Sequence, residues 1–419
     1  MRLPSLALAG LALAVPVSAA AQDPDAARLE RARALLRRHP VLDGHNDVAW
    51  EIRRAPGAPR DVAAYDLRRR TPGHTDLARL REGGVGGQFW SAYVDAEARD
   101  TGWARMQLEQ IDIVRRMVAR YPEALALALT AADAERAMRA GRIASFIGME
   151  GGHVLENSLG ALRAYHALGA RYLTLTHNTT LDWADAALGA RRHGGLTPFG
   201  REVVREMNRL GMLVDLSHVS PETMHDALDV AQAPVIFSHS SARALVDHPR
   251  NVPDDVLARL AANGGVVLVT FVPAFVSAEV MRWEAARDAE AAAAATAGLD
   301  ADATRRRLQD WEADHPRPEA TLAQVADHIE HVRRVAGEDH VGLGGDFDGI
   351  TTTPEGLRDV AGYPKLFAEL LRRGWSEAAL AKLASGNLLR ALRGAEQVAA
   401  RLQREREPSV ATIEALDRR

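Results

Sequence analysis

Short runs of apolar residues recur along the chain, and each run ends in a small or polar residue and is followed by a helical pattern. The runs are apolar throughout rather than alternating, which is typical of parallel strands that are covered on both faces. The pattern therefore favours an α/β fold with a parallel sheet. We predict eight strands, at residues 40–47, 86–93, 143–151, 171–178, 212–218, 234–240, 265–271 and 341–348.

Amphipathic helical stretches separate these runs, and a charged helix over residues 26–38 precedes the first of them. Eight alternating strand–helix units in one chain of 419 residues predict a (β/α)8 TIM barrel. A doubly wound open sheet is the alternative. That fold more often carries a glycine-rich phosphate loop after its first strand, and this sequence has none there.

Two segments interrupt the alternation. Residues 277–321 are rich in Ala, Arg, Asp and Glu and predict a helical insertion between strands seven and eight. The insertion is either a lid or contact surface, or a solvated appendage, and we favour the appendage. Residues 401–419 are charged and predict a helix with a frayed tail. We expect a single barrel domain over residues 26–400.

The first residues combine a positive start, an apolar middle and small residues that end near Ala19–Ala21. Residues 1–21 therefore predict a secretory signal peptide, which is too short for a membrane span with the usual flanks. The chain contains no cysteine, which excludes disulfides, thiol chemistry and a cysteine-linked lipid anchor. A net charge of −4 gives no case for binding nucleic acid. We expect an exported (periplasmic or secreted), soluble protein without a membrane anchor.

Histidines and carboxylates gather where the predicted strands end, which is where barrel enzymes carry their reactive groups. His45 and Asp47, two residues apart on a strand, point to the same face. Any one such residue has a structural reading, such as a hydrogen-bonded histidine, a helix cap or a turn residue, and we favour the turn reading for Asp348. The other strand ends supply Glu150, His177, His218, His239 and Asp346.

Together these groups would form a buried polar cluster with a large desolvation cost, which metal binding relieves. One zinc ion needs three or four protein ligands. The candidates are His45, Asp47, Glu150, His218 and His239, with Asp346 in reserve. This surplus fits two metal ions bridged by one carboxylate, with an activated water between them. The two lysines, Lys365 and Lys382, lie too late in the chain to supply a carboxylated bridge, so Glu150 is the natural bridge.

Over residues 39–393 the chain resembles the membrane (renal) dipeptidase family, zinc peptidases among the amidohydrolase-like metal-dependent hydrolase barrels. The matching blocks are 43–47 (DGHND), 148–153 (GMEGGH), 173–178 (LTLTHN), 215–218 (DLSH), 237–242 (FSHSSA), 250–255 (RNVPDD) and 344–349 (GGDFDG). The resemblance implies that His45 and Asp47 bind one zinc ion, that His218 and His239 bind the other, and that Glu150 bridges them. It also implies hydrolysis of free dipeptides by a metal-bridging hydroxide, and a possible homodimer.

The resemblance also implies substrate contacts. His177 would stabilise the tetrahedral oxyanion, Arg250 would bind the C-terminal carboxylate, and Asp346 would meet the free amino group or move the proton. An arginine and a carboxylate so placed would measure the length of a dipeptide. Phe275 stands where some relatives have a tyrosine, so one substrate hydrogen bond differs. Family members commonly accept a D-residue at the second position, which we take as a hypothesis here.

Two other functions remain open. One is a different barrel hydrolase with the same metals, such as an N-acyl-amino-acid deacylase, a lactonase or a phosphotriesterase. The pair of Arg250 and Asp346 argues against it, because an acyl amino acid has no free amine for the acid to meet. The other is a non-catalytic exported binding protein, which would be expected to have lost at least one ligand.

Overall fold

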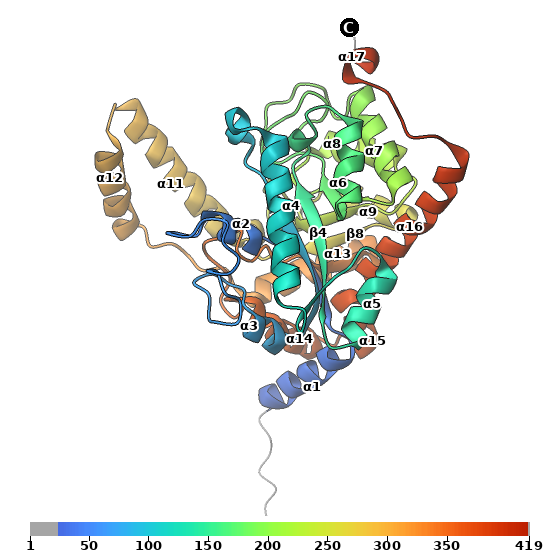
Figure 1. Cartoon of the computed structure of the whole chain (residues 1–419). Coiled ribbons are helices and arrows are strands. Elements are labelled where there is room, and N and C mark those ends of the chain that lie inside the picture. Colours follow the sequence, from blue (N-terminus) through green and yellow to red (C-terminus); the bar gives the residue numbers. More distant parts are fainter. Residues whose placement is uncertain (1–23, 418–419) are drawn as a thin grey trace, which may run out of the picture.

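The parallel strands form a barrel with helices around it (Figure 1). The computed structural model describes residues 24–417, except for the side chains of residues 99–101, so the predicted signal peptide lies outside the described residues. Neighbouring strands follow the order of the chain, as a TIM barrel requires. The strands are β1 (Val41–Asn46), β2 (Val85–Tyr93), β4 (Ile143–Glu150), β5 (Ala170–Thr174), β6 (Leu213–Asp215), β7 (Ile236–Ser240), β8 (Val266–Val269) and β9 (Val341–Leu343). The predicted fold class is confirmed.

The barrel is joined where its last strand meets its first. Asn46 forms a parallel bridge with Phe347, and the Asp47 amide donates to the Phe347 carbonyl at 2.9 Å. The Asp346 amide donates to the His45 carbonyl at 3.2 Å. This seam therefore runs directly past two of the predicted ligands.

One further strand was not predicted. The segment β3 (Leu125–Leu127) pairs in parallel with the outer edge of β4, beside the barrel path. Three residues are too few to show a period, so the sequence carries no readable strand signal there.

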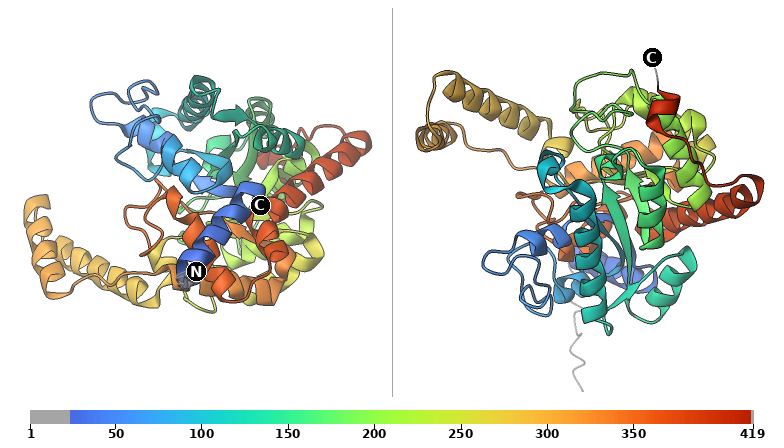
Figure 2. Two further views of the ribbon diagram at one scale, coloured as in Figure 1. Left: turned by 90° about the horizontal axis from the view of Figure 1, so that it is seen from below. Right: turned by 45° about the horizontal axis from the view of Figure 1, so that its top comes forward.

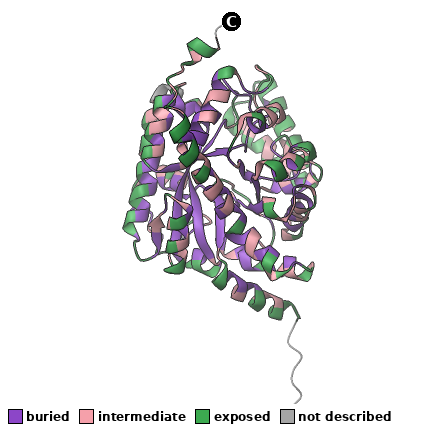
Figure 3. Cartoon of the chain, turned by 90° about the vertical axis from the view of Figure 1, so that its right-hand side faces the viewer, coloured by how far each residue is buried: buried purple, intermediate pink, exposed green. Residues whose placement is uncertain are grey.

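Helices pack around the barrel and leave polar outer faces, while the strands are buried (Figure 3). Many begin with a side-chain cap: the hydroxyls of Ser158, Thr197 and Ser220 each accept a hydrogen bond from the third residue of the helix that follows. The main helices are α1 (Pro24–Arg38), α2 (Val48–Arg54), α3 (Leu77–Glu82), α4 (Trp103–Arg120), α5 (Ala131–Arg139), α6 (Leu159–Ala167), α7 (Pro198–Leu210), α8 (Pro221–Val230), α9 (Asp254–Asn263), α13 (Leu322–Ala336), α14 (Tyr363–Arg372), α15 (Glu377–Ala381) and α16 (Asn387–Glu405).

Aromatic side chains fill the barrel interior. The rings of Phe89 and Phe146 stack with centroids 4.7 Å apart, and Tyr172 lies 5.0 Å from Phe89. A side chain at Gly148 would collide with the ring of Tyr172, so glycine makes room for it there. This packing turns the Tyr172 hydroxyl toward the strand ends, where it meets His45.

The predicted insertion between the seventh and eighth barrel strands is helical. After the short α10 (Pro273–Val276), α11 (Ala278–Thr296) and α12 (Ala301–Asp314) form a hairpin that extends away from the barrel (Figure 2). The rings of Trp283 and Trp311 join the two helices at 5.6 Å, and α12 has no buried residue. This arrangement favours the solvated appendage over a lid.

The chain continues as helix beyond residue 400, because α16 ends at Glu405. A later turn, α17 (Ile413–Leu416), brings the Asp417 carboxylate to the start of α7, where it accepts hydrogen bonds from Thr197 and from the Phe199 amide. Among the described residues, no helix is long and apolar enough to be a candidate membrane span.

Candidate metal centre

Side chains from four strand ends meet in one buried cluster around Glu150. The two carboxylate oxygens of Glu150 divide the cluster: Oε2 lies 3.3 Å from His45 Nε2, whereas Oε1 lies 3.1 Å from His218 Nε2 and 3.4 Å from His239 Nε2. Asp47 Oδ2 lies 3.1 Å from His45 Nε2. The cluster therefore contains two ligand groups that share Glu150, as a bridging carboxylate requires.

Each of these residues is placed by the end of a strand. Glu150 is the last residue of β4, and His45 and Asp47 end β1 and begin the loop after it. His239 lies within β7, and His218 follows β6 in a turn. Because parallel strands end at one rim of the barrel, residues almost 200 positions apart in the chain come together there.

The hydrogen bonds of His218 and His239 fix their protonation. The Asn178 amide oxygen accepts from His218 Nδ1 at 2.9 Å. Ser238 donates its hydroxyl proton to Asp215 at 2.6 Å and so accepts from His239 Nδ1 at 2.8 Å. Both Nε2 atoms therefore carry lone pairs, yet they face one another at 2.9 Å. Two lone pairs in this position call for a cation between them.

His45 gives the same indication on the other side of Glu150. Its Nδ1 meets the Tyr172 hydroxyl at 2.8 Å. Its Nε2 is buried and makes no hydrogen bond of acceptable geometry, although the carboxylate oxygens of Asp47 and Glu150 lie 3.1 and 3.3 Å away. A buried nitrogen without a well-aligned partner costs free energy unless a ligand satisfies it. The donor set of imidazoles and carboxylates thus fits a divalent metal such as zinc.

Burial sets the charge state of the neighbouring groups. It lowers the pKa of His218 and of His239 well below the ordinary value, which keeps both rings in the neutral form that binds metals. Burial raises the pKa of Asp346 well above its usual range, and the charges of Asp47 and Glu150 act in the same direction. Asp346 Oδ1 lies 3.9 Å from His45 Nε2, at the edge of the cluster.

The backbone is strained where the site requires it. His218, Asp346 and Asp348 have φ angles of 68°, 60° and 67°, in the left-handed region that residues other than glycine rarely adopt. Such strain gathers at functional sites because the surrounding structure must hold it. The Asp348 carboxylate accepts from the His74 amide at 2.6 Å, which agrees with its reading as a turn residue.

A cavity of about 400 Å³ opens over the cluster. Arg250 lines it, is 2% exposed, and has no carboxylate in ion-pair contact among the described residues. Its guanidinium makes only long contacts, 3.5 Å to Ser240 Oγ and 3.4 Å to the His239 carbonyl, and lies 5.3 Å over the ring of Phe275. Burial lowers the pKa of Arg250 to about 10, so it is still a cation at neutral pH. A buried cation of this kind is a ready partner for a carboxylate.

The sequence-predicted residues all lie at this cavity or in the cluster beneath it. His177, Phe275 and Asp346 line the cavity with Arg250, and His177 Nε2 is 4.0 Å from Glu150 Oε1. The structure therefore brings together every residue that the sequence nominated for the site.

Aromatic residues on the cavity wall were missed. Tyr93 lies against Trp50 and His177, each with ring centroids 4.9 Å apart, and His248 lies 4.3 Å from Phe275. A search for metal ligands passes over such residues. Tyr93 could have been found as the last residue of the second predicted strand.

Comparisons with known proteins match most of the chain to one peptidase family. A family model described as membrane dipeptidase (peptidase family M19) matches residues 29–406. The chain is 42% identical over 374 residues to dipeptidase 3 of Mus musculus, which covers 88% of this chain and 67% of the mouse protein.

Two solved structures are similar along most of the chain. One, described as the probable dipeptidase PvdM from Pseudomonas aeruginosa, is 25% identical with a TM-score of 0.76 and covers 89% of this chain and 100% of that one. The other is a metallopeptidase from Rhodobacter sphaeroides liganded with a phosphinate mimic of the dipeptide L-Ala-D-Ala. It is 26% identical with a TM-score of 0.69 and covers 85% of this chain and 99% of that one.

Proposed function

Because the chain belongs to the membrane dipeptidase family, peptidase family M19, we propose that its buried cluster binds two zinc ions and hydrolyses free dipeptides. The family consists of metallo-dipeptidases, so the chain is an enzyme of that class. The finer proposal rests on the two carboxylate oxygens of Glu150, which face different groups of ligands. One of its oxygens faces His45, beside Asp47, and the other faces His218 and His239.

The proposed metal sites follow from this division. His45 and Asp47 would hold one ion, His218 and His239 the other, and Glu150 would join both. When bound, the two ions would supply an activated water and polarise the amide carbonyl. The two ligand groups also explain why three imidazole nitrogens in the cluster have no suitable protein donor.

The residues on the cavity wall would hold the substrate. Arg250 is a buried cation without an ion-pair partner among the described residues, and a bidentate contact would fix the C-terminal carboxylate of a dipeptide. His177 borders Glu150 and would stabilise charge on the carbonyl oxygen. Asp346 would accept a hydrogen bond from the free amino group or move a proton to the leaving amine.

A further part of the proposal concerns the configuration of the second residue of the dipeptide. The Rhodobacter sphaeroides relative was solved with a mimic of L-Ala-D-Ala. We propose that the present enzyme also accepts a D-residue at the second position. Phe275 packs on His248 and on the guanidinium of Arg250, so the wall beside the proposed carboxylate site is aromatic rather than hydrogen-bonding. We also propose that the enzyme is exported and that it forms a homodimer.

The first test compares L-Ala-D-Ala and L-Ala-L-Ala with their N-acetyl forms, before and after chelation and after zinc is added back. We expect cleavage of the free dipeptides only, loss of cleavage with chelator, and recovery at two zinc ions per chain. Equal cleavage of the N-acetyl forms would instead favour an N-acyl-amino-acid deacylase. Cleavage of L-Ala-L-Ala alone would end the D-residue proposal.

A further inference from the structure

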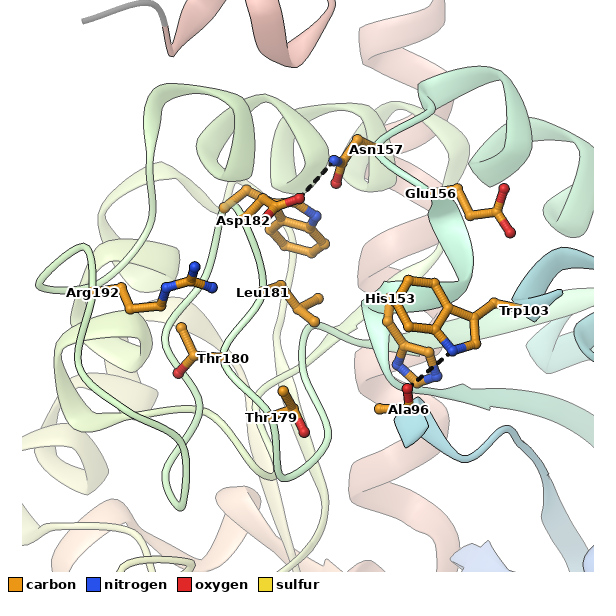
Figure 4. Close-up of a pocket in the computed structure, with 11 residues that line it drawn as sticks. Ala96, Trp103, His153, Glu156, Asn157, Thr179, Thr180, Leu181, Asp182 and Arg192 are labelled. Carbon is orange, nitrogen blue, oxygen red and sulfur yellow. Dashed lines mark hydrogen bonds between the residues drawn. The ribbon is translucent and has the colours of Figure 1, made fainter. Parts of the chain in front are cut away.

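A second cavity, larger than the one over the metal centre, lies beside it on the same rim of the barrel. It has a volume of about 620 Å³ and shares no lining residue with the first cavity (Figure 4). The two are nevertheless neighbours, because His153 and Thr179 on its wall follow Glu150 and His177 by three and two residues. No residue that we propose to bind metal or substrate lines this second cavity.

The wall of this second cavity holds a buried imidazole without a hydrogen bond. His153 is 4% exposed, and neither ring nitrogen has a partner of acceptable geometry, although the Val94 carbonyl lies close by. Burial lowers the pKa of His153 to about 4, so the ring is neutral and offers a lone pair. Trp103 lies edge-on to the ring at 5.2 Å, which holds its orientation. A buried lone pair at a cavity wall is a place for a ligand's donor.

The opposite side of the cavity carries a cation. Figure 4 shows the guanidinium of Arg192 extending inward across the cavity from His153 and Trp103. Among the described residues no carboxylate pairs with Arg192, while its neighbour Arg191 pairs with Glu222 at 2.7 Å. The loop that carries Arg192 is held by Asp185, which accepts the backbone amides of residues 192 to 195. The cation is therefore presented by an ordered loop.

One part of the remaining wall is apolar. Leu181 and the fully buried Trp183 line it together with Trp103. Two consecutive residues on the wall, Glu156 and Asn157, have left-handed φ angles of 47° and 59°. The Asn157 amide donates to Asp182 at 3.0 Å, which ties the two loops that form the rim. Strain that is held in this way marks a wall with a fixed shape.

We propose that this second cavity binds a dipeptide, with the dipeptide's carboxylate on Arg192, its ammonium group donating to His153, and an apolar side chain against Trp103 and Leu181. The choice of a dipeptide rests on the proposed function, which places dipeptides at this rim. The ligand has one anionic and one cationic end. The cavity offers Arg192 to the first and, to the second, the lone pair of His153 beside the lining carboxylates of Glu156 and Asp182. Binding there needs no metal ion.

The test is a calorimetric titration of L-Ala-L-Phe into the zinc-loaded enzyme that carries one equivalent per chain of a phosphinate dipeptide mimic, which blocks the metal centre and leaves the second cavity free. We expect one equivalent to bind. Arg192→Ala should weaken this binding at least tenfold, and His153→Phe should weaken it as well. Arg191→Ala is the matched control and should bind as the wild type does. The N-acetyl and C-terminal amide forms of L-Ala-L-Phe should each bind more weakly.

Absence of binding to the blocked enzyme, or equal loss in the Arg191→Ala and Arg192→Ala variants, would overturn the proposal. Binding that Arg192→Ala leaves intact would overturn it too. The titration measures binding and not turnover. A protein that fails to cleave dipeptides but shows Arg192-dependent binding would contradict only the proposed function.

Discussion

The carboxylate of Glu150 determines the arrangement of the proposed metal centre, since both ligand groups need it. We expect Glu150→Gln to lose bound zinc and to lower kcat/KM by about 10³-fold or more, because a neutral amide cannot offset two divalent charges. Metal content per chain and dipeptide hydrolysis check this. Glu123→Gln is the control, because this residue is exposed and its one ion pair within residues 24–417 is with Arg68. A Glu150→Gln variant that retains two zinc ions would contradict the bridging role.

Tyr172 acts on the site through His45. Its hydroxyl is the partner of His45 Nδ1 at 2.8 Å and orients the ring. We expect Tyr172→Phe to weaken zinc binding about 10- to 100-fold, as loss of a group that orients a metal ligand commonly does. Competition with a chelator measures the affinity.

Tyr165→Phe provides the matched control, because that hydroxyl is also buried but bonds the Val154 carbonyl at 3.1 Å. Similar losses of zinc affinity in the two variants would show a general effect on folding rather than orientation of His45.

At this scale the sequence indicated which residues gather in the cluster, but not which residues support them. His45, His218 and His239 each stand at the end of an apolar run, and their recurrence there pointed to one shared site. The residue Tyr172 sits inside a strand and looks like any core aromatic. Its role depends on which strand lies beside it, and that information is absent from a local pattern.

Among the helices, α13 and α14 are held together by a group of charges around Arg373. Arg373 pairs with Asp327, with Glu330 and with Glu369 at 2.6–2.7 Å. The neighbouring arginines Arg372 and Arg373 lower the pKa of Glu369 to about 2. A carboxylate whose folded pKa is depressed stabilises the fold above its ordinary pKa, and this contribution is lost as pH falls toward 2.

We therefore expect Glu369→Gln to destabilise the protein at pH 5 by about 1 kcal/mol, a value reduced for solvent screening, and by less at pH 3. Urea unfolding of wild type and variant at both pH values gives the two differences. The same difference at pH 5 and pH 3 would show that the ion pairs contribute little.

The hairpin of α11 and α12 should open independently of the barrel. Its helices meet through Trp283 and Trp311, and α12 buries no residue. We expect Trp311→Ala to speed amide hydrogen exchange in residues 301–314 about tenfold or more while exchange in the barrel strands stays unchanged. Arg305→Ala, an exposed position on the same helix, is the control. Faster exchange throughout the barrel would contradict this independence.

Long elements, whose residues repeat a helical or strand pattern several times, were predicted better than short ones. The helix α8 (Pro221–Val230) lies between two predicted strands, and a serine cap and a proline mark its start in the sequence. The strand Leu125–Leu127 escaped notice because its pairing with β4, and not its own composition, makes it a strand.

For the whole molecule, the proposed metals should contribute to stability. Ions that bind only the folded state add about 3 kcal/mol at a hundredfold excess over Kd. We expect chelation to lower Tm and zinc to restore it, as measured by scanning calorimetry. Equal Tm values with and without chelator, at confirmed loss of zinc, would contradict a metal-stabilised cluster.

The seam between the first and last strands has a kinetic consequence. Its two backbone hydrogen bonds use His45 and Asp47 themselves, at the carbonyl of one and the amide of the other. A fluctuation that parts the seam would therefore also disturb one proposed ion's ligands. We expect the residence time of that ion to follow the opening rate of the seam, so that the half-life for zinc release to a chelator and for exchange of the Asp47 amide change together with temperature.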